Sequence, residues 1–190
     1  MKRTYKPIYI LLSLCMLFAF CACGTKQDTP IIRASELSKE TQELIQPLEN
    51  DTKFFDFTTD ASVTHAVIAI RYCENGTWQE TEPLMELSDL EPGTYQMILR
   101  WIDSRVDVIV SADGVSWSNP YTIEPEQWDA YRASVITSTV GFGPEQSIVT
   151  GSDIPLWCVY GSNTEEISSQ SLDYTNSDCD TGFAITATFS

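Results

Sequence analysis

The most hydrophobic stretch of the chain lies at its N-terminus. Residues 8–20 form a nearly unbroken apolar run, and three basic residues stand among the first six positions. A charged start followed by a short apolar run is typical of a secretory signal, and it is too short for a membrane span followed by a stop-transfer pattern. We therefore expect residues 1–22 to be a signal peptide that export removes.

A polar stretch and then a helical spacing follow this run. Positions 24–30 are polar, which indicates a flexible spacer, and positions 35–49 carry apolar residues at helix-like intervals. Ser35 or Ser38 can serve as the N-cap, and Pro47 indicates that the helix ends before it. The apolar positions are Leu37, Leu44, Ile45 and Leu48. The sequence therefore predicts a short N-terminal helix, or an ordered arm.

From Phe54 onward, β-branched and aromatic runs alternate with turn residues. Asn75-Gly76 and Asp113-Gly114 are strong hairpin signals, because these residue types tolerate the positive φ of a type I′ turn. The expected strands cover 63–72, 77–80, 94–102, 105–110, 133–140, 154–160 and 183–189, with a further strand after Gly114. About eight strands at this spacing predict a mostly β domain, an antiparallel β-sandwich rather than a barrel.

The residues that follow the apolar run resemble the lipobox of bacterial lipoproteins. The segment is Phe20-Cys21-Ala22-Cys23-Gly24, and it departs from the family pattern at Phe20, where Leu is usual, and at Cys21, where Ala or Ser is usual. The resemblance implies that Cys23 receives diacylglycerol and becomes the mature N-terminus. Two or more lipid chains anchor a protein stably, so the expected location is the outer face of the cell membrane. Ordinary secretion is the alternative.

The predicted organisation is a signal peptide (1–22), a lipidated cysteine with a flexible tether (23–33), and one β-rich domain (34–190). This arrangement, with an Asn-Gly-Thr-Trp hairpin, resembles small Gram-positive lipoproteins that carry a β-sandwich ectodomain. The segment 111–117 also resembles the Asp-box hairpin of secreted β-proteins, which implies a structural turn away from any active site. Neither resemblance implies an activity.

The charge of the chain excludes several partners. The signal holds three of the eleven basic residues and none of the 27 acidic ones, so the mature chain has a formal net charge of −19. Such a surface repels nucleic acid and anionic lipid. We therefore expect no nucleic-acid partner, and we interpret the charge as a means of keeping a cell-surface protein soluble.

Three of the six cysteines remain beyond the lipobox: Cys73, Cys158 and Cys179. An odd number outside the cell allows at most one disulfide and leaves one free thiol. We expect Cys158 and Cys179 to pair, since they lie near adjacent predicted C-terminal strands. No histidine stands at ligand spacing, which argues against a zinc site.

No catalytic constellation is evident, so we do not expect an enzyme. His65 is the single histidine and lies in a strand pattern, where a structural role is favoured. Asn176, Asp178 and Asp180 precede Gly182 and resemble half of a calcium loop, but no bidentate Glu follows at the required distance. We interpret them as a solvated acidic turn and expect neither a metal nor another cofactor.

The aromatic residues offer a candidate binding site. Most of the five tryptophans lie in or beside strands, where they would fill the core or brace hairpins. Trp128, Tyr131 and Phe142 are the candidates for an exposed ligand-binding platform. We therefore expect a non-catalytic binding or accessory module, engaging a surface protein or an envelope polymer such as a carbohydrate. A cell-wall or glycan-active enzyme and a passive structural lipoprotein are the alternatives.

Overall fold

The computed structural model describes residues 29–45, 52–164 and 171–190. The predicted signal peptide, Cys23 and most of the tether therefore lie outside the described residues. Within the described ranges, no helix is both long and apolar enough to cross a membrane.

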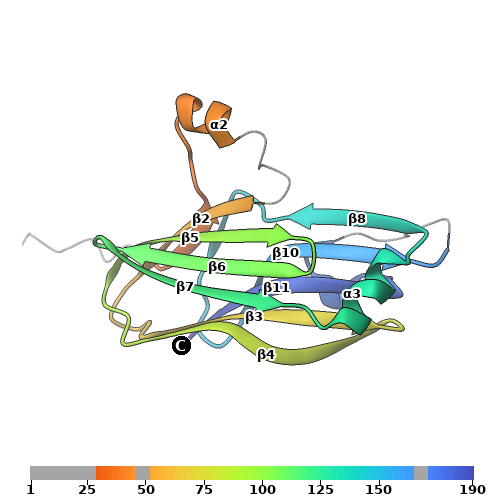
Figure 1. Cartoon of the computed structure of the whole chain (residues 1–190). Helices are drawn as coiled ribbons and strands as arrows, with labels where there is room; N and C mark the ends of the chain where they lie inside the picture. Colours follow the sequence, from red (N-terminus) through yellow and green to blue (C-terminus); the bar gives the residue numbers. More distant parts are fainter. Residues whose placement is uncertain (1–28, 46–51, 165–170) are drawn as a thin grey trace, which may run out of the picture.

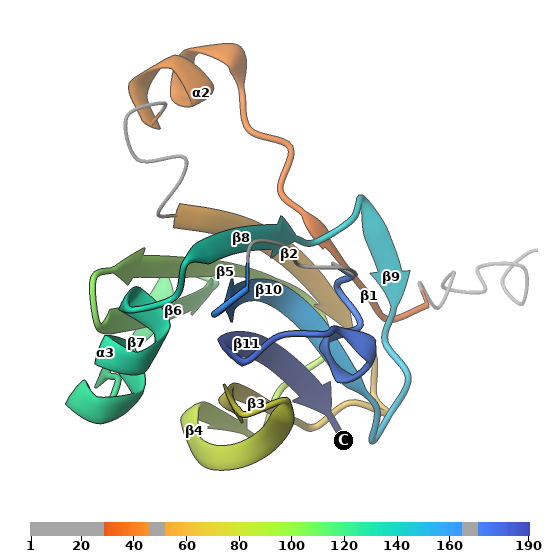
Figure 2. The ribbon, with the colours of Figure 1, turned by 90° about the vertical axis from the view of Figure 1, so that its right-hand side faces the viewer.

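The chain forms two antiparallel sheets packed face to face (Figures 1 and 2). Sheet A has the strand order β7-β6-β5-β2-β1-β9 and sheet B the order β4-β3-β11-β10-β8. The strands are β1 (Ile31–Ala34), β2 (Thr52–Thr59), β3 (His65–Glu74), β4 (Thr77–Ser88), β5 (Gly93–Ile102), β6 (Arg105–Ala112), β7 (Val115–Thr122), β8 (Ile136–Gly141), β9 (Glu145–Ser147), β10 (Asp153–Ser162) and β11 (Thr181–Phe189). The predicted β-sandwich is confirmed.

Alternating side chains of the two sheets form the main core. On β11, Phe183, Ile185 and Phe189 are almost completely buried, and they share one face because every second residue of a strand points the same way. Trp101 on sheet A contacts Trp157 at 5.5 Å and Phe183 at 5.7 Å between ring centroids. These rings, with the branched aliphatic residues around them, hold the two sheets together.

Both predicted type I′ hairpins are present. Asn75 and Gly76 have φ values of 49° and 77°, and Asp113 and Gly114 have φ values of 50° and 79°. The first pair joins β3 to β4 and the second joins β6 to β7. The segment that resembles an Asp-box hairpin is therefore a turn between neighbouring strands.

The β domain begins earlier than the sequence indicated. Residues 31–33 were assigned to the tether, but they form most of strand β1, which lies between β2 and β9. Ile32 is fully buried opposite Phe57. A four-residue strand is too short to show an alternating pattern, so only the adjacent pair Ile31-Ile32 could have signalled it.

Within the described residues, two short α-helices flank the sandwich. The predicted N-terminal helix is α2 (Lys39–Ile45), and Ser38 is its N-cap because its Oγ accepts from the Thr41 amide at 3.2 Å. The described side chains of α2, residues 39–43, are all exposed, and the helix projects from the sandwich (Figures 1 and 2). The second helix, α3 (Pro125–Arg132), was not predicted, although Pro125 occupies a favoured first-turn position.

Sheet B is also covered on its outer face. The connection between β10 and β11 contains a short 3-10 helix, η2 (Tyr174–Asn176), and supplies buried residues to a second apolar cluster. We call this cluster the outer core; its buried members are Cys73, Cys158, Tyr160, Tyr174, Cys179 and Ala184. Trp78 packs on it, with its ring centroid 4.9 Å from that of Tyr174. Strands β10 and β11 are therefore buried on both faces.

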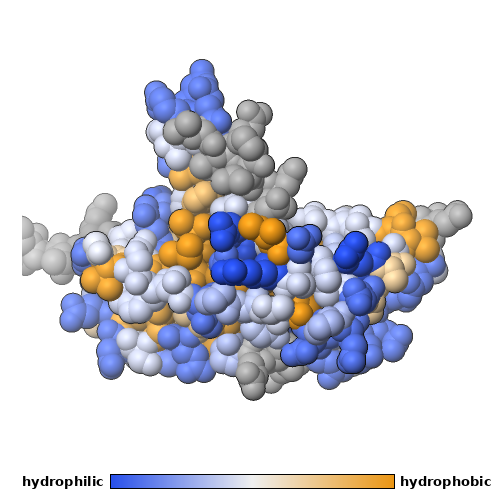
Figure 3. All heavy atoms as spheres, viewed as in Figure 1, coloured by the Kyte–Doolittle hydropathy of each residue, from blue (hydrophilic) through white to orange (hydrophobic). Residues whose placement is uncertain are grey.

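The outer face of sheet A carries hydrophobic and hydrophilic groups side by side (Figure 3). Phe54, Ile98 and Ile109 are half-buried neighbours across three strands. Beside them, Asp107 accepts from Arg100 Nη2 and from Arg105 Nε, each at 2.6 Å. Burial by itself raises the pKa of the Asp107 carboxyl, but the hydrogen bonds and charges of the two arginines together hold that pKa below its ordinary value.

This ion network predicts an acid-sensitive contribution to stability. Replacing Asp107→Asn should lower the free energy of unfolding by about 1 kcal/mol at neutral pH, since both arginines are half-exposed. A carboxyl whose pKa is lowered by folding stabilises above its unfolded pKa of about 3.9, and this contribution is lost as the pH falls through the folded pKa. Urea unfolding at neutral and acid pH measures the difference.

Asp129→Asn on the exposed face of α3 is the matched control and should have no such effect. A difference between wild type and Asp107→Asn that stays constant from neutral pH to about pH 2 would refute the role of this network.

Candidate functional site

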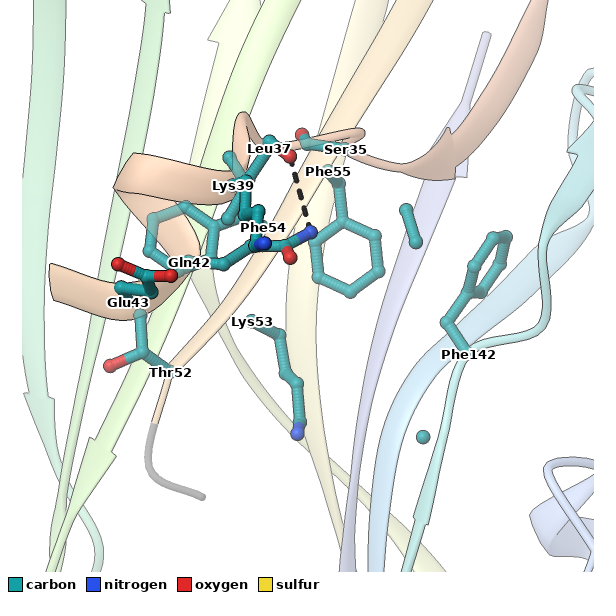
Figure 4. A pocket seen from close by; sticks show the side chains of 12 residues that line it. Ser35, Leu37, Lys39, Gln42, Glu43, Thr52, Lys53, Phe54, Phe55 and Phe142 are labelled. Carbon is teal, nitrogen blue, oxygen red and sulfur yellow. Dashed lines mark hydrogen bonds between the residues drawn. The ribbon is translucent and has the colours of Figure 1, made fainter. Parts of the chain in front are cut away.

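A cavity of about 590 Å³ lies between α2, the first residues of β2 and the residues that follow β8. Figure 4 shows side chains from all three segments facing it. Its lining residues are Ala34, Ser35, Leu37, Lys39, Gln42, Glu43, Thr52, Lys53, Phe54, Phe55, Gly141 and Phe142. This volume lies in the range of small-molecule binding sites.

Aromatic rings form the apolar wall of this cavity. Phe55 is 2% exposed and belongs to the main core. Phe142 is half-buried and meets Phe55 edge to face, with 5.6 Å between ring centroids and an interplanar angle of 81°. The Phe55 ring is therefore fixed by the core, whereas Phe142 presents part of its ring to the cavity (Figure 4).

Lys53 supplies a cation to the same wall. It points to the inner side of β2, because it stands two residues before Phe55. Its ammonium lies 5.4 Å from the ring centroid of Trp157, within range of a cation–π interaction. Lys53 is half-buried and lines the cavity, so its apolar stem can pack while its charged end stays at the cavity.

The opposite wall comes from α2 and the residues before it. Ser35 fixes this segment to β2: its amide donates to the Phe54 carbonyl at 2.9 Å, and its Oγ donates to Asp56 at 2.9 Å. Further along, Gln42 Nε2 donates to the Leu37 carbonyl at 3.1 Å (Figure 4). The start of this wall is therefore anchored, and α2 beyond it contributes polar side chains.

The charge of the cavity differs from that of the protein. Among its described lining residues, Lys39 and Lys53 are basic and Glu43 is acidic, whereas the full chain has a formal net charge of −16. A weakly basic, aromatic-walled cavity on an acidic surface can bind a ligand that combines a flat apolar face with hydrogen-bond acceptors.

The structure does not bring the three predicted aromatic residues together. Trp128 and Tyr131 lie on α3, 5.5 Å apart between ring centroids, and both pack on Phe183 of the main core. Phe142 lies beyond the other end of β8, a six-residue strand of about 20 Å. Trp128 and Tyr131 therefore brace the sandwich, and Phe142 alone belongs to the cavity.

Two of the three residues that resemble half of a calcium loop form hydrogen bonds with different partners. Asn176 Nδ2 donates to Asp173 at 2.6 Å, and Asp180 accepts from the Asn163 amide at 2.6 Å. The described part of the chain contains no group of three His, Cys, Asp or Glu side chains placed to hold a metal ion. Asn176, Asp178 and Asp180 lie in the turn region beside the outer core, and Asp178 is exposed.

His65 lies away from the cavity. It begins β3, after the turn that follows the end of β2, whereas the cavity is at the start of β2. Its Nδ1 is 3.3 Å from Ser88 Oγ, and its amide donates to the carbonyl of the C-terminal Ser190 at 2.8 Å. These contacts give the histidine a structural setting at a strand end.

The predicted pairing of Cys158 with Cys179 is not the one that the structure favours. The thiol of Cys179 lies 3.3 Å from the sulfur of Cys73, while the Cys158 thiol donates to the Leu172 carbonyl at 3.7 Å. Cys158 was predicted as the partner because it and Cys179 lie near strands that are adjacent in sequence. In the structure, Cys179 lies in the connection on the outer face of sheet B, next to Cys73 of β3.

None of the expected strands covers β2, and one signal at its start could have revealed it. Phe54 and Phe55 are adjacent, so in a strand they must point to opposite faces. Two large aromatic residues in succession therefore indicate that both faces are covered. In the structure Phe55 enters the main core, and Phe54 lies beneath α2 on the cavity side (Figure 4).

The two aromatic residues of the cavity wall should respond differently to truncation. Phe55→Ala removes a buried ring and should lower the free energy of unfolding by about 3–5 kcal/mol. Phe142→Ala should cost only about 1 kcal/mol, because its ring is half-buried. Chemical denaturation of the two variants measures both values. Equal losses would show that Phe142 is part of the core rather than a surface of the cavity.

No protein-family model, curated protein sequence or solved structure matches this chain.

Proposed function

We propose that this protein is an exported, lipid-anchored, non-catalytic binding protein whose cavity holds a saccharide unit of an envelope polymer. The observation that carries the proposal is the cavity at the start of β2, whose lining includes both the aromatic ring of Phe142 and the side chain of Lys53. Sugars combine apolar ring faces with hydroxyl groups. Aromatic rings and polar side chains at one site complement both.

The lining residues supply both an aromatic ring and hydrogen-bonding groups. Phe142 can stack on the apolar face of a sugar ring, and Lys53 can donate to its oxygens. Gln42 and Glu43 on α2 lie across from these two residues (Figure 4). The helix has only seven residues, too few to be stable by itself, and its described side chains (39–43) are exposed. Bound ligand would stabilise this wall.

The chemistry of the cavity favours binding over hydrolysis. Glycoside hydrolysis generally needs two carboxyl groups placed on either side of the scissile bond. Glu43 is the one carboxylate among the described residues that line the cavity. Acid–base catalysis of this kind needs two carboxyl groups whose environments push their pKa values apart, and a single exposed carboxylate cannot fill both roles.

The proposed anchor orients the cavity away from the membrane. Seven residues separate Cys23 from β1, a reach of at most about 25 Å. Strand β1 starts beside Ile148, whose amide donates to the Pro30 carbonyl at 2.8 Å. The cavity lies at the other end of β1, next to Ala34, so a lipid on Cys23 would direct it toward the cell wall.

A surface protein is the second candidate ligand, and a different region favours it. Strand β7 is an edge of sheet A, and its Val115 and Trp117 are 54% and 41% exposed. Unpaired edge strands with exposed apolar residues can extend a partner's sheet. Binding at this edge would depend on Trp117 and not on the cavity.

The anchor predicts a change of location for one substitution. In a Gram-positive host, the full wild-type chain should be recovered in the membrane fraction, and Cys23→Ser should remain unlipidated, because the acceptor sulfur is missing. Metabolic labelling with a fatty acid, followed by fractionation, measures both. Cys21→Ser is the matched control and should still be labelled. Labelling of Cys23→Ser would contradict the assignment of the lipid site.

The cavity predicts selective loss of saccharide binding. Titration of the full chain with soluble cell-wall glycan fragments should give saturable binding, and Phe142→Ala and Lys53→Ala should each weaken it roughly tenfold, a change of about 1.4 kcal/mol. Trp117→Ala is the control for an aromatic residue outside the cavity and should bind as wild type does.

If Trp117→Ala alone loses an interaction, the edge of β7 is the binding site and the partner is a protein. If the wild-type chain binds none of the glycan fragments, the saccharide proposal fails.

A further inference from the structure

Two thiols face each other in the outer core of sheet B. Cys73 is fully buried near the end of β3, and Cys179 is 4% exposed in the connection that leads into β11. The Cys179 thiol donates to the Cys73 sulfur at 3.3 Å, and the Cys73 thiol lies 3.6 Å from the Cys179 carbonyl. The two residues are 106 positions apart in sequence, so only the fold brings them together.

We propose that Cys73 and Cys179 are a covalent cross-linking site, which a disulfide-bearing oxidant such as oxidised glutathione converts into an intramolecular disulfide. The thiolate of one cysteine attacks the oxidant's disulfide and releases one thiolate. The second cysteine then attacks the resulting mixed disulfide and releases the other. Two cysteine thiols become one disulfide, and the oxidant takes up both protons and both electrons as two thiols.

The surroundings of the two thiols shift their pKa values in opposite directions. The hydrogen bond from Cys179 holds the pKa of the Cys73 thiol below its ordinary value, although burial opposes this shift. The same hydrogen bond, with burial and the nearby acidic side chains, raises the pKa of Cys179. The thiolate is the nucleophile in both exchange steps, and the linked product is the same whichever of the two sulfurs attacks first.

The third thiol lacks these features. Cys158 on β10 is as fully buried as Cys73, but its thiol donates to the Leu172 carbonyl and not to another sulfur. Burial raises the pKa of Cys158 to about 12. Cys158 therefore remains a thiol while Cys73 and Cys179 react. The three described cysteines then form one disulfide and leave one free thiol.

The cross-link would fasten the connection between β10 and β11 to the neighbouring strand β3. This connection covers the outer face of sheet B through Tyr174 and Cys179. Trp78 packs on the same residues from β4. A disulfide here closes a loop of more than a hundred residues and limits the freedom of the unfolded chain. The cross-linking proposal does not depend on the proposal that the cavity binds a saccharide.

Peptide mapping of the full chain tests the pairing directly. The purified protein is oxidised with glutathione disulfide, its remaining thiols are alkylated in denaturant, and it is digested without reductant. Trypsin alone leaves Cys158 and Cys179 on one peptide, since no Lys or Arg follows Arg132. A second cleavage after Glu166 separates them. We expect a linked peptide pair that contains Cys73 and Cys179, with Cys158 alkylated.

Single substitutions provide a second readout. Cys158→Ser should still form the cross-link, and Cys73→Ser and Cys179→Ser should not. A reductant should lower the thermal midpoint of the oxidised wild type and of Cys158→Ser by roughly 5–10 °C, and it should leave the other two variants unchanged. A linked peptide that contains Cys158, or alkylation of both Cys73 and Cys179 after oxidation of the wild type, overturns the proposal even if a variant fails to fold.

Discussion

Burial of alternating side chains between two antiparallel sheets is the constraint on which the rest of this structure depends. It places Phe55, Trp101 and Phe183 in one core, and it forces every intervening residue to an outer face. Sheet B covers part of its outer face with the connection between β10 and β11. The outer face of sheet A is half-exposed, and there Asp107 forms ion pairs with two arginines next to half-buried apolar residues. The candidate site lies where the inner face of β2 extends past the end of β8.

Local patterns predicted much of the fold. The hairpins at Asn75-Gly76 and Asp113-Gly114 follow from turn chemistry alone, and Ser38, one of two candidates, is the helix N-cap. Strands β1 and β9 and helix α3 were missed because each is short and draws its stability from tertiary packing. Strand β2 was missed as well, although it has eight residues. The partner of Cys179 was misassigned for a related reason, since pairing across 106 positions depends on strand order in space rather than on spacing along the chain.

The candidate site was harder to predict than the fold. Of the three predicted aromatic residues, Phe142 lines the cavity, whereas Trp128 and Tyr131 pack on Phe183 of the main core. Lys53 and Phe55 carry no motif, and they become a site only because the chain before β2 returns over them. A proposed lipid at Cys23 gives this arrangement a direction, because the short tether and β1 together would set the cavity on the side of the domain away from the membrane.

Hydrogen exchange on the full chain, with and without soluble cell-wall glycan, tests the central claim most directly. The account predicts slow exchange in β10 and β11 under both conditions, because both faces of these strands are covered. It predicts that the amides of α2 and of Phe142 exchange quickly in the free protein and are protected when glycan is bound. Protection confined to α3 or to β7, or no change at saturating glycan, would contradict the assignment of this cavity as the binding site.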